Sequence, residues 1–170
     1  EVGSDGARVA ICCPRQAEFV LAQLAILKSG NVFVPIDPGS PAGRIRAIVD
    51  SGGITLVLGL APGGDKLLPD DVRCVDISTL RELDGPAFSV PPQRADDPAY
   101  IVFTSGSTGT PKGAINSFRG MRNMTLAQVD NHDMTADTVM TVSANVAFDS
   151  ILWEIWPTLV SGGCLVMTPD

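Results

Sequence analysis

Short apolar runs alternate along the chain with stretches that carry apolar residues at helical spacing. Runs at residues 8–13, 32–36, 54–58 and 100–104 predict buried strands, because they are short and rich in β-branched residues. Between the first two runs, residues 16–28 place apolar side chains every three or four positions, which predicts a helix. Strands that alternate with helices favour parallel pairing through right-handed crossovers. The sequence therefore predicts an α/β fold with a parallel-rich sheet and flanking helices.

The rest of the chain continues this alternation around one interruption. Residues 84–98 contain four prolines and several charges, and they predict an exposed connector rather than packed structure. Further helices are predicted from residue 41 to 49, from residue 116 or 117 to about 129, and from 149 to 159. Further strands are predicted at 73–76, 139–142 and 164–167.

The charge balance limits the classes of partner. The chain has 170 residues, 19 acidic and 12 basic, and a formal net charge of -7. Such a chain is a poor general binder of nucleic acid or anionic membranes, and no apolar run reaches membrane-spanning length. The four cysteines lack paired metal-ligand spacing, which favours buried thiols in a reducing cytoplasm over metal ligands. We therefore expect a cytoplasmic protein without nucleic-acid, membrane or metal sites of its own.

The segment after the fourth predicted strand, T-S-G-S-T-G-T-P-K-G at residues 104–113, carries the clearest chemical signal. Its glycines expose backbone N–H groups, its hydroxyls add donors, and Lys112 supplies one positive charge, which together suit a polyphosphate. The predicted order of strand, loop and helix would add the positive end of a helix dipole. The spacing differs from the common P-loop, G-x-x-x-x-G-K-[ST]. A polar surface loop is the other interpretation, but the lysine and the flanking elements favour phosphate binding.

Three segments carry a family resemblance, in the same order as in the family. Residues 100–114, YIVFTSGSTGTPKGA, closely resemble the signature loop of the adenylate-forming superfamily, which includes nonribosomal peptide synthetase adenylation domains, acyl-CoA synthetases and firefly luciferase. Residues 27–45, LKSGNVFVPIDPGSPAGRI, resemble the upstream motif of adenylation domains, and residues 148–167 resemble the downstream F-D-x-S motif with its helix. The resemblance implies that residues 1–170 are an incomplete fragment of the large N-terminal subdomain of an adenylate-forming enzyme.

The activity that the resemblance implies is activation of an amino acid by ATP to aminoacyl-AMP and pyrophosphate, for thioester loading in nonribosomal peptide synthesis. The implied catalytic residues are Lys112 and Thr108. The implied ATP-phosphate ligands are Thr104, Ser105, Gly106, Ser107, Thr108, Gly109 and Lys112. Mg²⁺ accompanies ATP in this chemistry, and we expect most of its ligands outside this fragment. The implied partners are the remainder of the domain and a carrier (thiolation) domain.

The resemblance also implies a substrate site formed by Asp149, Ser150 and Trp153. In amino-acid-activating members of the family, the F-D-x-S aspartate pairs with the substrate ammonium, while the other two positions line the side-chain pocket. The alternative role of Asp149 is a helix N-cap, which is compatible with substrate binding. Two positions depart from the family pattern. Ile151 replaces the motif serine, and Phe118 stands where many relatives have histidine.

Two alternatives remain open. One is an acyl- or aryl-CoA ligase of the same superfamily, against which the ammonium-pairing Asp149 argues. The other is a non-catalytic fragment that docks a partner such as a small MbtH-like protein. In either enzyme interpretation the isolated fragment is expected to be inactive, because the later family motifs do not occur in its sequence.

Overall fold

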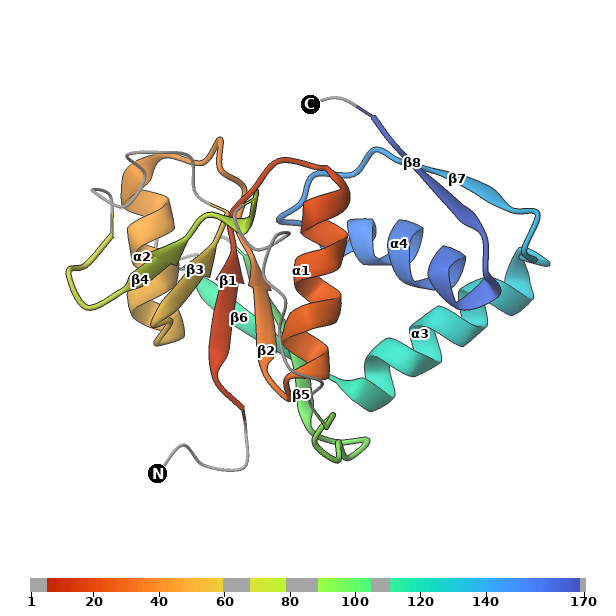
Figure 1. Cartoon of the computed structure of the whole chain (residues 1–170), viewed down its shortest axis with the longest axis horizontal. Helices are drawn as coiled ribbons and strands as arrows, with labels where there is room; N and C mark the ends of the chain where they lie inside the picture. Colours follow the sequence, from red (N-terminus) through yellow and green to blue (C-terminus); the bar gives the residue numbers. More distant parts are fainter. Residues whose placement is uncertain (1–5, 60–67, 79–88, 105–110, 169–170) are drawn as a thin grey trace.

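A computed structural model describes residues 6–59, 68–78, 89–104 and 111–168 (Figure 1). The observed helices lie close to the predicted ones, and the described residues contain one strand that the sequence pattern did not predict. In chain order the elements are β1 (Arg8–Ile11), α1 (Ala17–Lys28), β2 (Val32–Pro35), α2 (Ala42–Gly52), β3 (Leu56–Leu58), β4 (Arg73–Val75), β5 (Pro98–Thr104), β6 (Lys112–Ser117), α3 (Phe118–Asn131), β7 (Val139–Val142), α4 (Ser150–Ser161) and β8 (Cys164–Met167).

Six strands form the main sheet in the order β4-β3-β1-β2-β5-β6, and every neighbouring pair is parallel except β5 and β6. Successive residues of β1 point to opposite faces, as a strand requires. Val9 and Ile11 pack in the core cluster on the α1 side, whereas Ala10 packs with the helix α2 on the other side. The expected parallel-rich sheet with flanking helices is confirmed.

A second, two-stranded parallel sheet is formed by β7 and β8, which α4 connects. The helix α4 is anchored by Ile151, Leu152 and Ile155, none of which exposes any surface. These residues belong to the same apolar cluster as residues of α1 and β5, so α4 is held against the α1 face of the main sheet. The helix ends at Gly162, whose φ of 80° is a left-handed conformation that favours glycine.

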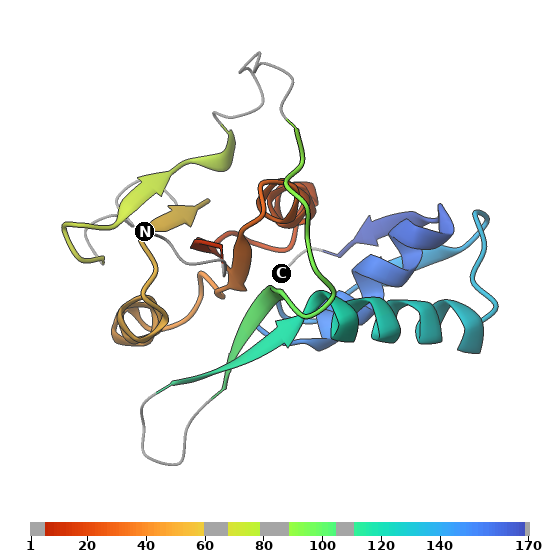
Figure 2. The same cartoon turned by 90° about the horizontal axis from the view of Figure 1, so that it is seen from below.

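The unpredicted strand, β6, corrects the expected order of strand, loop and helix around the glycine-rich segment. Lys112–Ser117 pairs antiparallel with β5, and α3 begins only after it (Figure 2). Most of β6 is exposed, and the side chain of Ile115 is 60% accessible, so no alternating apolar pattern marked it as a strand. The start of α3 agrees with the prediction, and the hydroxyl of Ser117 accepts a hydrogen bond from the N–H of Gly120 at 3.3 Å.

Candidate functional site

The predicted phosphate loop joins the two strands of the β5–β6 hairpin. Thr104 ends β5 and lies opposite Lys112, the first residue of β6, and the Thr104 hydroxyl donates to the Lys112 carbonyl at 3.4 Å. Both residues are exposed. Thr104 and Lys112 are therefore brought together, whereas the five predicted phosphate ligands between them lie outside the described residues: Ser105, Gly106, Ser107, Thr108 and Gly109.

Gly113, which follows the lysine of this motif, has a packing role in the hairpin. A Cβ atom there would lie 2.8 Å from Cγ2 of Ile101 and 3.0 Å from Cζ of Phe103, so a side chain would displace two core residues of β5. The expectation that a helix N-terminus follows the loop directly is wrong, because β6 intervenes before α3. The N-terminus of α3 therefore does not follow the loop directly, and Lys112 is the charged residue of the motif that the structure describes at this end of the hairpin.

The three predicted substrate residues lie together on the first turns of α4. Asp149 occupies the N-cap position with φ -65° and ψ -25°, and its side chain makes no capping hydrogen bond to the helix. Trp153 stands four residues later, which places it on the same helix face, and its side chain is 52% exposed. Ser150 is also exposed, whereas Ile151, where the motif of the family has serine, is a core residue. Asp149 thus presents a carboxylate that the helix itself does not use.

The negative charge of Asp149 affects the pKa of a tyrosine on β5. Tyr100 is buried and its ring stacks on Phe33 of β2, with the ring centroids 5.4 Å apart. Burial raises the pKa of the Tyr100 phenol, and the negative charge of Asp149 raises it further. Because β5 also ends at Thr104, one strand connects the surroundings of Asp149 with the phosphate-loop hairpin.

A polar residue that the sequence interpretation did not select, Glu154, holds the segment that leads into α4. One carboxylate oxygen, Oε2, accepts from the backbone N–H groups of Ser143 at 3.0 Å and Ala144 at 3.1 Å. The other, Oε1, accepts from the Ser143 hydroxyl at 3.2 Å. Glu154 is the only charged residue of α4, and this isolated charge in an apolar helix is the signal that could have identified it.

Two further side chains hold the same segment from the main sheet. Arg15, which follows β1, donates from Nη1 to the Ala144 carbonyl at 3.0 Å and from Nε to the Thr168 carbonyl at 3.2 Å. Asp37, which follows β2, accepts from Nδ2 of Asn145 at 2.7 Å. All of these groups lie just beyond the carboxyl ends of parallel strands, where ligands bind in open α/β sheets. We call the connection of residues 143–149 the β7–α4 segment.

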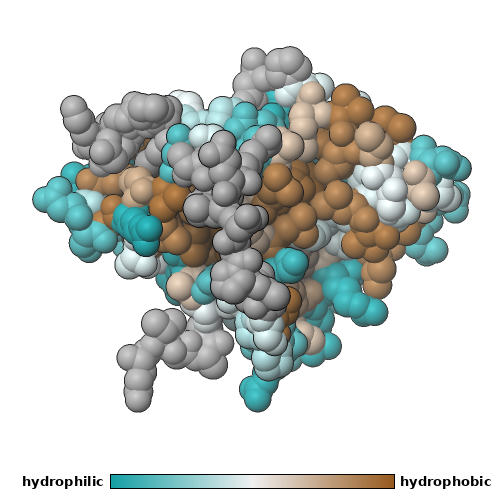
Figure 3. Space-filling model, in the orientation of Figure 1, coloured by the Kyte–Doolittle hydropathy of each residue, from teal (hydrophilic) through white to brown (hydrophobic). Residues whose placement is uncertain are grey.

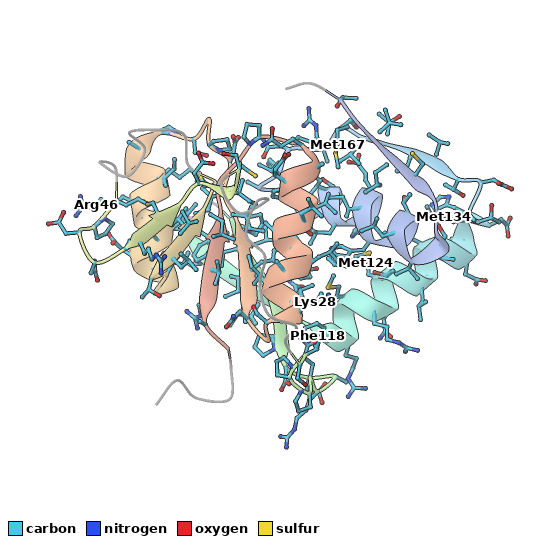
Figure 4. The ribbon with its side chains drawn as sticks, in the orientation of Figure 1. Lys28, Arg46, Phe118, Met124, Met134 and Met167 are labelled. Carbon is cyan, nitrogen blue, oxygen red and sulfur yellow. The ribbon has the colours of Figure 1, made fainter. Side chains whose placement is uncertain are left out.

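An apolar groove of about 330 Å³ lies between α1, α3 and α4. Phe118 starts α3 and lies near the Lys28 end of α1 (Figure 4), and the surface over α1 and α4 is largely apolar (Figure 3). At the position where the family resemblance leads us to expect histidine, this chain thus has an aromatic residue in an apolar groove. The groove is lined by Leu27, Phe118, Met121, Arg122, Thr125, Leu126, Trp156 and Val160.

Two of the cysteines, Cys12 and Cys13, are buried, which changes the acidity of their thiols. Burial raises the pKa of both Cys12 and Cys13 to about 12, so neither is a ready thiolate. In the described part of the chain, no three His, Cys, Asp or Glu side chains are grouped to hold a metal ion. Among the same residues, none of the helices has the length and apolar character needed to cross a membrane.

The chain is similar in sequence to known proteins. Similar proteins include the hybrid PKS-NRPS synthetase pydA of an Acremonium species, 38% identical over 97% of this chain, and a linear gramicidin synthase of Brevibacillus parabrevis, 36% identical over 97%. The chain spans only 4% and 3% of these two proteins.

Solved structures extend the comparison to the fold. The N-terminal subdomain of NpsA from Klebsiella oxytoca, in complex with 3-hydroxyanthranilyl-AMSN, matches with a TM-score of 0.83 and 29% identity, over 98% of this chain and 41% of that chain. The nonribosomal peptide synthetase FmoA3, in its α-methyl-L-serine-AMP bound form, matches with a TM-score of 0.87 and 28% identity, over 96% of this chain and 18% of that chain. The family model for AMP-binding enzymes spans residues 3–170, and the chain belongs to that family.

Proposed function

We propose that this chain is part of an amino-acid adenylation domain, which converts an amino acid and ATP to aminoacyl-AMP and pyrophosphate. The observation that carries the proposal is Asp149, an exposed carboxylate at the start of α4 that caps no helix N–H group and shares a face with Trp153. The FmoA3 structure, solved with an amino-acyl adenylate, supports the same class of substrate.

The substrate ammonium is the partner that Asp149 lacks within the helix. A carboxylate that faces an ammonium makes a charge-assisted contact, and an acid without the amine leaves that carboxylate unpaired. In this proposal Ser150 and Trp153 line the pocket for the substrate side chain, with the indole as an apolar wall. Discrimination between amino acids and their deaminated analogues then follows from a single side chain.

The adenylation step needs charge neutralisation more than a protein nucleophile. An oxygen of the substrate carboxylate attacks the α-phosphorus of ATP, the bond between that phosphorus and the bridging oxygen to the β-phosphate breaks, and pyrophosphate leaves. We assign Lys112 and Thr108 as catalytic residues that contact the phosphates, and Thr104, Ser105, Gly106, Ser107 and Gly109 as further phosphate ligands. Their ammonium, hydroxyl and N–H groups offset the charge that develops on the leaving group. Mg²⁺ bound with ATP would supply further positive charge, and we expect most of its protein ligands outside residues 1–170.

The partners follow from the same chemistry. An acyl adenylate is a reactive mixed anhydride, so the proposed acceptor is the thiol of a carrier (thiolation) domain, to which the acyl group passes as a thioester. One similar structure is an artificially fused adenylation-PCP di-domain, NpsA-ThdA, which covers 98% of this chain with a TM-score of 0.85. The remainder of an adenylation domain, and a docked MbtH-like protein, complete the proposed set of partners in the cytoplasm.

A second candidate function is activation of an aryl acid, with a carrier domain or coenzyme A as the acceptor. It is favoured by one observation, the NpsA subdomain structure in complex with 3-hydroxybenzoyl-AMSN, at 30% identity to this chain. An aryl acid of that kind carries no ammonium for Asp149. In the first candidate function the Asp149 carboxylate binds the substrate ammonium, and in the second it has no such partner. Asp149 is therefore the residue whose substitution separates the two functions.

The test measures pyrophosphate exchange into ATP by the full-length protein that contains this chain. We expect exchange only when an amino acid is supplied, and we expect Asp149→Ala to abolish it. The matched control is Asp130→Ala, which removes an exposed acid at the end of α3 and should leave exchange unchanged. Equal exchange with the deaminated acid, or coenzyme A consumption with an aryl acid, would overturn amino-acid activation in favour of the second candidate.

A further inference from the structure

The β7–α4 segment carries Asp149 but contains no regular secondary structure, so side chains must fix its course. It begins at Ser143, directly after β7, and it ends at Asp149, directly before α4. Glu154 reaches back from the second turn of α4 and binds the start of the segment through three hydrogen bonds of 3.0 to 3.2 Å. We propose that Glu154 is a positioning residue that sets where Asp149 and Trp153 stand, and this inference rests on the proposed function of Asp149.

These hydrogen bonds close a ring of chain that contains all three proposed substrate residues. The ring runs from Ser143 to Glu154, so Asp149 and Trp153 lie inside it and can move only as the ring deforms. Both oxygens of the Glu154 carboxyl group act as acceptors, so the side chain binds the start of the segment at three points. The ring therefore restricts the backbone conformations of a segment that would otherwise sample many of them.

Contacts within the ring remove most of the freedom that remains. The Oδ1 atom of Asn145 accepts from the N–H of Ala147 at 2.9 Å, and the N–H of Phe148 donates to the Asn145 carbonyl at 3.1 Å. The side chain of Val146 is 4% exposed and belongs to the core cluster that holds α4. The segment is thus fixed at its start by Glu154 and in its middle by the core, which leaves Asp149 in one place relative to Trp153.

A purely structural role for Glu154 makes a different prediction. The carboxylate could serve only to satisfy the two N–H groups at the end of β7. Its loss would then lower the stability of the whole site and raise the KM for the amino acid and the KM for ATP alike. A positioning role acts on the amino-acid side of the site, because the phosphate-loop hairpin is held by its own strand pairing with β5. The two roles are separated by comparing the KM for the amino acid with the KM for ATP.

The experiment uses the full-length protein and pyrophosphate exchange, with Glu154→Ala, Glu154→Gln and Glu154→Asp. We expect Glu154→Ala to raise the KM for the amino acid about tenfold or more and to leave the KM for ATP within about twofold, because small displacements of a binding group have large kinetic costs. Glu154→Gln should recover most of this loss, since its amide oxygen can accept from both N–H groups. Glu154→Asp keeps the charge but is one methylene shorter, so it should raise the KM for the amino acid even where Glu154→Ala fails to fold.

The outcomes distinguish the inference from the function on which it rests. If the wild-type protein shows no amino-acid-dependent exchange, the proposed function fails and the role of Glu154 fails with it. If the wild type is active and Asp149→Ala is not, but the Glu154 variants keep a normal KM for the amino acid, only the inference is overturned. Equal increases in both KM values would assign Glu154 to structure alone. Asp130→Ala serves again as the control that removes an exposed acid.

Discussion

The two ends of the candidate site are built in different ways. The β7–α4 segment is held by side chains from outside it, namely the sequence-distant Arg15 and Asp37 and the nearby Glu154, and by the buried face of α4. The phosphate-loop hairpin is held by backbone pairing between adjacent strands, and the residues at its end, Thr104 and Lys112, are exposed. Substitutions that release the β7–α4 segment should therefore change the free energy of unfolding. Substitutions of Thr104 or Lys112 at the end of the hairpin should change the rate of pyrophosphate exchange and leave the stability unchanged.

The largest expected effect on stability is in the core of α4. Ile155→Ala removes a side chain with no exposed surface, and it should lower the free energy of unfolding by about 2–5 kcal/mol through lost burial and a cavity. The matched control is Val160→Ala on the same helix, whose side chain is 58% exposed and whose loss should change stability by less than about 0.5 kcal/mol. Urea denaturation of the two variants checks the difference. Equal losses would contradict the anchoring of α4 by one buried face.

The second largest effect on stability is expected at Arg15, whose side chain joins the main sheet to the second sheet. Arg15→Ala removes two charge-assisted hydrogen bonds to the carbonyls of Ala144 and Thr168, and it should cost about 1.5–3 kcal/mol of unfolding free energy. Arg15→Lys should recover only part of this, because one ammonium replaces a planar fork of donors. Hydrogen exchange at the ends of β7 and β8 measures the effect locally. An unchanged rate of hydrogen exchange at the ends of both strands in Arg15→Ala would show that the apolar core alone joins the two sheets.

Much of the helix and strand order followed from the spacing of apolar residues, because the buried faces of α1, α2 and α4 leave a periodic signal. The strand β6 left no such signal, since its stability comes from pairing with β5 and its side chains are mostly exposed. The grouping of Asp149 with Trp153 was also predictable, as residues four apart share a helix face. The roles of Glu154 and Arg15 were not, because most of their partners are backbone N–H and C=O groups, which nearly every residue has.

A smaller effect is expected at the open end of the hairpin, where Arg119 donates to both carboxylate oxygens of Asp96 at 2.7 and 3.0 Å. The hydrogen bond from Arg119, and then its charge, lower the pKa of the Asp96 carboxyl below its ordinary 3.8. A lowered pKa in the folded state means that the ionised form stabilises folding. The contribution is present above pH 3.8 and is lost as the pH falls through the folded-state value.

Asp96→Asn should therefore have a slightly lower Tm than the wild type at pH 7, and the gap should close as the pH is lowered below 3.8. Thermal unfolding at several pH values and at low salt measures the gap, because an exposed ion pair is screened at high salt. A gap of constant size across the acid range would mean that the asparagine acts through packing rather than through the lost charge.

The smallest effect on stability, and the clearest contrast with Ile155, is expected at Lys112. Lys112→Ala should change the unfolding free energy by less than about 0.5 kcal/mol, because the side chain is exposed and β6 is held by its backbone. Pyrophosphate exchange should nevertheless fall about a hundredfold, since a charge that stabilises the leaving phosphates is lost. The control is Arg46→Ala, which removes another exposed cation, on α2 (Figure 4), and should leave pyrophosphate exchange unchanged. A loss of stability in Lys112→Ala comparable to that of Arg15→Ala would remove the contrast, because the hairpin end would then be structural and its lysine would no longer be free for the nucleotide.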